Sequence, residues 1–304
     1  MNLKNDLQTS IRRVLSTPNR GRYTSVQALL LFWQDDNETS KAQSAIRELA
    51  NVFDKYYHYS FQIQAIPSSQ NHKSSWIWLS RKLNDFIKDG GHRDVLKIVY
   101  YAGDTYLDGS RQMVLTSSRD YDRPSTIRWG GIQQFLEKGY ADTLIIMDSA
   151  YYPTEKMVRQ QGVLELIATS ASDERFCSLD RYAFTRALAE HLRTRATCLS
   201  PLSAVELHSH LAHYPRIVQE KNPEKEVITS YPFPLYMMMS GNSMIPSIFL
   251  SPLDQGSPMI NRFSIVSNPQ LDLSIHLADG KVDVDSWIEW LRQAPKGIKE
   301  VKVS

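Results

Sequence analysis

The chain has few cysteines and no long apolar run. Its 304 residues include two cysteines, Cys177 and Cys198, which are too few for a disulfide framework and indicate a reducing compartment. No run approaches the roughly eighteen apolar residues that a membrane span needs. Charged residues such as Lys4, Asp6 and Arg12 precede any apolar run, which is not typical of a secretory signal. The sequence therefore predicts a cytoplasmic or nuclear protein that is not secreted and does not enter a membrane.

An excess of one charge and the common cofactor motifs are also missing. There are 35 Lys and Arg against 33 Asp and Glu, a net charge of +2, and no basic block is long enough to follow a nucleic acid. The chain lacks G-x-G-x-x-G, a phosphate-binding loop and H-E-x-x-H. His208, His210 and His213 are close in sequence, but on a helix they would not converge on one ion. We expect no nucleic-acid partner and no cofactor.

The patterns that are present indicate alternating strands and helices. Apolar residues make up 42% of the chain and charged residues 22%, which is ordinary for a globular protein. The strands are apolar on both faces, which predicts an α/β fold with a mostly parallel sheet covered by helices on both sides. The first expected strands are 26–33, 61–66, 95–102 and 143–147, and the expected helices are 40–57, 76–87, 126–138 (with Ser125 as its N-cap), 162–170 and 178–192.

The pattern changes after Cys198, and we predict three parts. Residues 1–24 form an N-terminal helical extension, residues 25–255 form the α/β domain, and residues 256–304 form a small appendage. The appendage is expected to be strand, helix and strand, because an apolar helical pattern lies between two alternating stretches there.

Two apolar runs end on carboxylates. The stretch KIVYYAGD ends at Asp104, and DTLIIMDSA ends at Asp148, Ser149 and Ala150. In parallel sheets, ligands bind beyond the carboxyl ends of the strands. These residues are therefore candidates for a functional site.

The same two runs resemble the active-site strands of the caspase-haemoglobinase superfamily, particularly fungal caspase-like proteins and metacaspases. In that family one strand ends in Tyr-Tyr/Phe-Ala/Ser-Gly-His and the next in Asp-x-Cys. The similar context covers roughly residues 25–255 and includes the first strand ending in Phe-Trp and the stretch GVLELIAT. The resemblance implies a caspase-like sheet with a cleft near Gly103, Thr105, Asp148 and Ser149.

The departures from the family pattern remove its catalytic dyad. Asp104 stands where the family has its histidine, followed by Thr105 in place of a small residue, and Ala150 stands where the family has its cysteine. Alanine has no nucleophilic atom, and a carboxylate of ordinary pKa is a poor base for a thiol. The resemblance therefore implies a pseudoenzyme that binds a protein or peptide, or regulates an active caspase-like relative. It leaves the oligomeric state open.

Two alternatives remain. Ala150 could be an engineered replacement of a catalytic cysteine, although this would not explain Asp104. A divalent ion, Mg²⁺ or Ca²⁺, could instead be held by oxygens of Asp36, Asp104 and Asp148 at neighbouring strand ends. Asp35 and Asp36 are cleft candidates too, but they are more simply interpreted as solvated loop residues. Asp148 either lines an acidic pocket for a basic side chain, as the resemblance implies, or caps loop amides as a buried carboxylate.

Overall fold

A computed structural model describes most of the chain between residues 23 and 253. The described residues are 23–35, 39–68, 72–89, 94–117, 124–153, 159, 162–171, 182–198, 201–221, 233–240 and 246–253, together with 287, 290 and 301. Within the chain, Tyr23–Leu253 is one compact unit. The N-terminal extension and nearly all of the appendage lie outside the described residues, so the three-part division stays a prediction.

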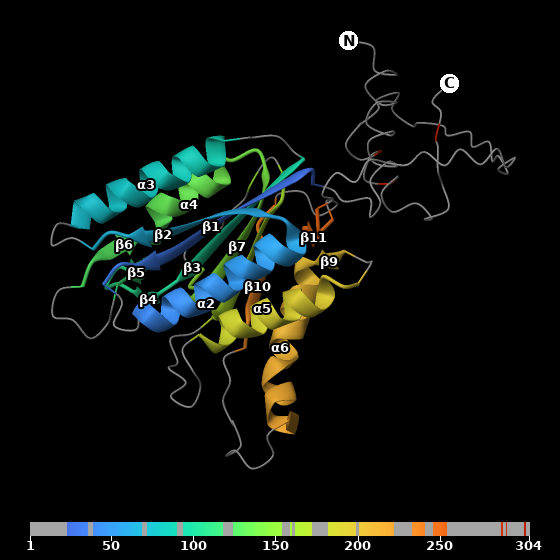
Figure 1. Cartoon of the computed structure of the whole chain (residues 1–304). Helices are drawn as coiled ribbons and strands as arrows, with labels where there is room; N and C mark the ends of the chain where they lie inside the picture. The colour runs from blue at the N-terminus through green and yellow to red at the C-terminus, as the bar shows by residue number, and fades with distance from the viewer. Residues whose placement is uncertain are drawn as a thin grey trace, which may run out of the picture. The chain divides into compact units, whose positions relative to one another are not determined.

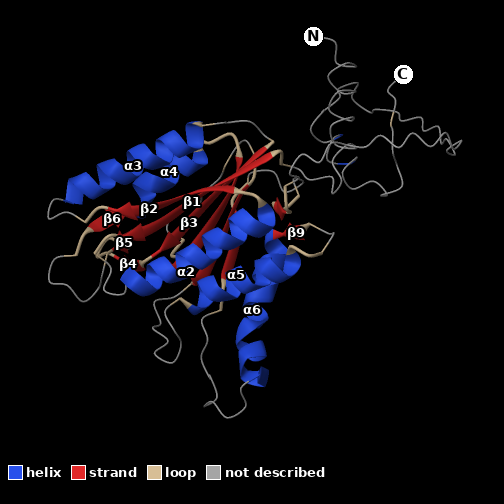
Figure 2. Ribbon diagram, in the orientation of Figure 1, coloured by secondary structure: helices blue, strands red, loops and turns tan. Residues whose placement is uncertain are grey.

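A six-stranded sheet forms the centre of this unit, in the order β10-β8-β7-β3-β1-β2 (Figures 1 and 2). Its first five strands along the chain are parallel to one another, and β10 is antiparallel to β8. The predicted α/β fold with a mostly parallel sheet is confirmed. The strands are β1 (Ser25–Trp33), β2 (Ser60–Ile66), β3 (Val95–Ala102), β7 (Asp142–Ala150), β8 (Leu164–Ser170) and β10 (Leu235–Met238).

Helices cover both faces of the sheet, as predicted. Alternate residues of a strand face opposite sides, so Leu30 of β1 packs into one core while Leu29 and Leu31 pack into the other. The first core lies under α2 (Thr39–Val52), η1 (Phe53–Tyr57), α5 (Ala183–Arg195) and α6 (Ala204–Lys221), and the second under α3 (His72–Lys88) and α4 (Trp129–Glu137) (Figure 1). None of the described helices is both long and apolar enough to cross a membrane.

Two small antiparallel sheets lie beside the main one. One joins β4 (Asp104–Leu107), β5 (Met113–Thr116) and β6 (Thr126–Arg128), and the other joins β9 (Leu202–Ser203) and β11 (Phe249–Leu250). Only Gly103 separates β3 from β4, so the chain leaves the main sheet at Asp104, the first of the candidate site residues.

Two helix predictions were wrong. Residues 162–170 were expected to be helical, but Leu164–Ser170 is strand β8, with Leu166 facing one core and Ile167 the other. A short apolar run buried on both faces has no period that separates strand from helix. The helix expected over 126–138 begins only at Trp129, because Thr126–Arg128 pairs with β5. Ser125 is therefore not its N-cap.

Candidate functional site

Strands β7, β3 and β1 are neighbours, and their carboxyl ends meet at one edge of the sheet. The register aligns Phe32 of β1 with Ala102 of β3, and Ala102 with Asp148 of β7. The buried hydroxyl of Thr105 donates a 2.6 Å hydrogen bond to the main-chain oxygen of Ala150. The structure therefore brings the two candidate strand ends together.

The remaining candidates at this edge are Asp35 and Asp36. Asp35 is exposed in the turn after β1, in agreement with the solvated-loop interpretation. Asp36 lies outside the described residues.

Gly103 lies where the chain turns from β3 into β4, against two aromatic side chains. The indole Nε1 of Trp33 donates to the Tyr101 hydroxyl at 2.9 Å, and that hydroxyl donates to the main-chain oxygen of Asp104 at 3.0 Å. A Cβ atom on Gly103 would lie 2.4 Å from the Tyr101 hydroxyl oxygen and 3.0 Å from Cδ1 of Trp33. A glycine is thus needed here because of close packing, and the aromatic pair fixes the main chain at Asp104.

Asp104 occupies the position that the resemblance gives to the catalytic histidine. It is half-buried, begins β4 and lies opposite Thr116 of β5. Its place is therefore set by strand pairing and by the Tyr101 hydrogen bond to its carbonyl.

Asp148 is buried, with 8% of its surface exposed, and its carboxylate accepts hydrogen bonds from hydroxyl groups. Thr185 of α5 donates to Oδ2, and the single hydroxyl proton of Thr169 of β8 is shared between Oδ1 at 3.3 Å and the main-chain oxygen of Met147 at 3.2 Å. Tyr100 also hydrogen-bonds to Thr185, and since the Thr185 proton goes to the carboxylate, Tyr100 is the donor. These hydroxyls hold the carboxylate on the α5 side of the sheet.

The electrostatics at Tyr100 agree with this arrangement. Burial raises the pKa of Tyr100 well above its usual value, and the nearby Asp148 carboxylate raises it further. The tyrosine therefore stays protonated and remains a donor. Sequence reasoning missed the roles of Thr169 and Thr185, because they lie 21 and 37 residues from Asp148 in the sequence.

A β-bulge separates Asp148 from Ala150. Met147 pairs with Ala168 and Ala150 with Ser170, so β7 has one residue more than β8 in this interval. As a result Ala150 packs on the same core as Met147, under α3 and α4, while Asp148 faces α5.

Ser149 lies inside this bulge. It is buried, and its hydroxyl has no hydrogen-bond partner among the described residues. A serine becomes a nucleophile when a base accepts its proton, and no described side chain does so.

The candidate metal ligands are only partly described. Among the described residues, no group of three or more His, Cys, Asp or Glu side chains is placed to hold a metal ion. The magnesium or calcium alternative also needs Asp36, which lies outside them, so it stays a prediction.

The three histidines of α6 have three different neighbours. His208 hydrogen-bonds to the oxygen of Pro234 at 2.8 Å, His213 to that of Ser209 at 2.7 Å, and the His210 ring stacks on His191 at 4.1 Å. They do not converge, as the helical spacing predicted.

Comparisons with known proteins give similarity only at the level of solved structures. No protein-family model matches the chain, and no curated protein matches it. The Drosophila initiator caspase Dronc is similar at 8% identity and a TM-score of 0.44, over 74% of this chain and 82% of that one. Caspase-1 from Spodoptera frugiperda is similar at 12% identity and 0.43, over 78% and 92%. A structure of pro-sf-caspase-1 is similar at 13% identity and 0.40, over 72% and 92%. These values are too low to carry function from those proteins to this chain.

Proposed function

We propose that this chain is a caspase-like pseudoenzyme, related to fungal caspase-like proteins, that acts as a protein-binding, peptide-binding or regulatory module. One observation carries the proposal. Ala150, where the resemblance has a nucleophile, is joined through its carbonyl to Thr105, the residue after Asp104, where the resemblance has a base. If the resemblance holds, these are the two dyad positions, and neither Asp104 nor Ala150 is the residue that the family uses there.

Peptide cleavage by the cysteine-peptidase mechanism that the resemblance implies needs both missing groups. A thiolate attacks the peptide carbonyl, and an imidazole takes the thiol proton and returns a proton to the leaving amine. A methyl group at Ala150 can do neither. A carboxylate at Asp104 would have to hold a proton near neutral pH to act as the acid.

The surrounding structure supports a domain kept for its fold. Strand β3 is buried along its whole length, and β7 is buried up to Ser149. The Asp148 carboxylate accepts a hydrogen bond from Thr185 of α5. A natural loss of both groups explains Asp104 and Ala150 together, whereas an engineered Ala150 leaves Asp104 unexplained. We propose a protein, a peptide or an active caspase-like relative as the partner, in the cytoplasm or the nucleus.

A peptidase assay tests the proposal. The purified chain is incubated with fluorogenic peptides that end in Arg, Lys or Asp, with and without Ca²⁺, beside an active caspase-type peptidase as a positive control. We expect no turnover by this chain. Turnover that disappears in Asp104→Ala or Ser149→Ala would sink the proposal, since it would identify a working catalytic group in the same cleft.

A further inference from the structure

Among the strands that the structure describes, β2 is the last at one edge of the main sheet. Its sequence, SFQIQAI, has no charge and no proline, and its register with β1 is continuous from Ser60 to Ile66 without a bulge. Among the described strands it pairs only with β1. Natural edge strands are usually protected from pairing by charges, prolines or bulges. This edge has none of these, so it is ready to accept another strand.

The outward main-chain groups of β2 are set by its pairing with β1. The Ile66 oxygen accepts from the Gln34 nitrogen at 3.0 Å on the β1 side. Because the direction of the main-chain N–H and C=O groups alternates along a strand, Phe61, Ile63 and Ala65 direct theirs away from β1. Phe61 also exposes 37% of its surface.

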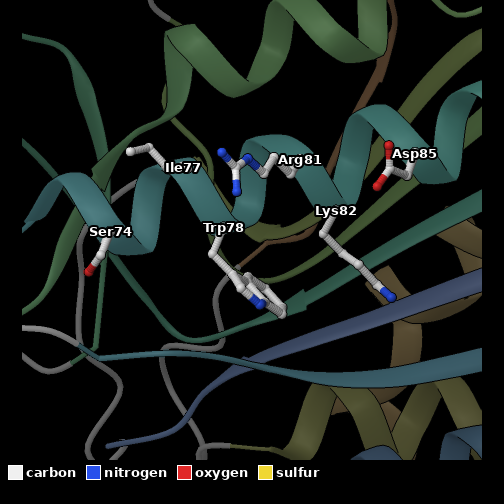
Figure 3. Close-up of a pocket in the computed structure, with 6 residues that line it drawn as sticks. All are labelled: Ser74, Ile77, Trp78, Arg81, Lys82 and Asp85. Atoms are coloured by element: carbon white, nitrogen blue, oxygen red, sulfur yellow. The ribbon is translucent and has the colours of Figure 1, made fainter.

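Helix α3, which covers the second core, carries a groove lined by side chains of both charges on the same face of the sheet as that core. The groove has a volume of about 560 Å³ and is lined by Ser74, Ile77, Trp78, Arg81, Lys82 and Asp85 (Figure 3). Their spacing of three and four places these residues on one face of the helix. In Figure 3 the side chains of Trp78 and Lys82 point from α3 toward the strands. Ile77 is 41% exposed, so the groove offers apolar surface beside charged groups.

We propose that β2 pairs with β2 of a second copy of this chain, antiparallel and with a two-fold axis at Ile63. In this register Ile63 faces Ile63 of the second copy, and Phe61 faces its Ala65. These residues carry the outward main-chain groups, so each pair exchanges hydrogen bonds. Gln62 faces Gln64 of the second copy, and side-chain amides can donate to and accept from one another. The edge is therefore complementary to itself.

The charges on α3 support the same axis. Ser75 Oγ donates to the oxygen of Pro67 at 2.7 Å. Along the strand direction, Ser75 of α3 therefore lies beside Pro67, which is four residues beyond Ile63. Four strand residues span about 13 Å, which corresponds to roughly nine residues of helix. Since α3 runs back along β2, the axis passes α3 between Arg81 and about Asp85. Arg81 of each copy then faces Asp85 of the other, which favours a second copy over an acidic or basic peptide.

Charge reversal tests this pairing without disturbing the fold, because Arg81 and Asp85 are both exposed. Sedimentation equilibrium of the whole chain should show a mass that rises with concentration from 34.9 kDa toward twice that value. Arg81→Asp and Asp85→Arg should each weaken the dimer by about tenfold or more, because each places like charges opposite one another. An equimolar mixture of the two variants should restore the dimer, since both pairs across the axis then join opposite charges.

Met238→Lys is the matched control, because Met238 is 38% exposed on β10 at the opposite edge of the sheet. It should leave the mass distribution unchanged, and Ala65→Pro, which removes an outward N–H, should weaken the dimer. A chain that is monomeric at all concentrations, a dimer unaffected by the charge reversals, or a dimer lost in Met238→Lys would each overturn the proposal. Mass is measured independently of peptidase activity, so this result and the pseudoenzyme test can fail separately.

Discussion

Gly103→Ala should destabilise the chain strongly, because its new methyl group would collide with the aromatic pair beneath the strand end. The new Cβ would lie 2.4 Å from the Tyr101 hydroxyl oxygen and 2.7 Å from Cζ of the same ring. Overpacking of this kind costs about 1–3 kcal/mol. Moving the Tyr101 hydroxyl also breaks its hydrogen bonds with Trp33 and with the Asp104 carbonyl, at about 1 kcal/mol each. We therefore expect a loss of about 3–5 kcal/mol in the free energy of unfolding.

Urea denaturation of the wild type and of Gly103→Ala measures this loss. Gly109→Ala is a suitable control, because no atom lies within 4 Å of its added Cβ. It should change the free energy of unfolding by no more than about 0.5 kcal/mol. The double variant Tyr101→Phe/Gly103→Ala should lose less than the sum of its single changes, because the closest clash is with the hydroxyl. If Gly103→Ala were as stable as Gly109→Ala, the argument from close packing would be refuted.

Three further outcomes are expected. Ala150→Cys alone should not restore cleavage of fluorogenic peptides, whereas Ala150→Cys with Asp104→His should restore a trace, because a thiolate needs its imidazole partner. Full activity of the single variant would show that Asp104 works as a base. Burial raises the pKa of Glu165 from 4.5 to about 7, so the folded chain binds this proton more tightly than the unfolded chain. That contribution is complete below about pH 4.5 and is lost as the pH rises through about 7, which should cost the wild type about 3 kcal/mol relative to Glu165→Gln in denaturation curves. Calorimetric titration with Mg²⁺, Mn²⁺ or Ca²⁺ should give no binding heat in the wild type or in Asp104→Asn, and millimolar or tighter binding that Asp104→Asn abolishes would favour the metal alternative.

The central strands could be predicted because their sequences carry a strong local signal. KIVYYAGD and DTLIIMDSA are long, rich in β-branched and aromatic residues, and bounded by polar residues, and they became β3 and β7. The helix prediction for 162–170 was wrong because an apolar run that is buried on both faces has no periodicity that separates a strand from a helix. The helix prediction for Thr126–Arg128 was wrong because these residues pair with β5. This is a tertiary contact, and such contacts override local propensity.

The candidate site could be predicted in position but not in detail. The rule that ligands bind beyond parallel strand ends predicted Asp104, Asp148 and Ser149 at one edge, and the register places Asp148 opposite Ala102, two residues before Asp104. The face that Ala150 takes could not be predicted, because it depends on the bulge. The partner of the Asp148 carboxylate could not be predicted either, because Thr185 is 37 residues away in the sequence. A one-residue shift in a strand reverses which face a side chain takes, and no residue in DTLIIMDSA marks that shift.

The bulge in β7 also bears on how the sequence can change over time. Because it places Asp148 and Ala150 on opposite faces, a substitution at one position need not disturb the packing of the other. A substitution at Asp148 would leave the buried hydroxyl of Thr185 without its carboxylate acceptor, so folding itself constrains that residue. Ala150 is only half-buried, and its link to Thr105 runs through the main chain, so its side chain can be replaced without loss of that link. The side chain at position 150 can therefore change while the packing around Asp148 is kept.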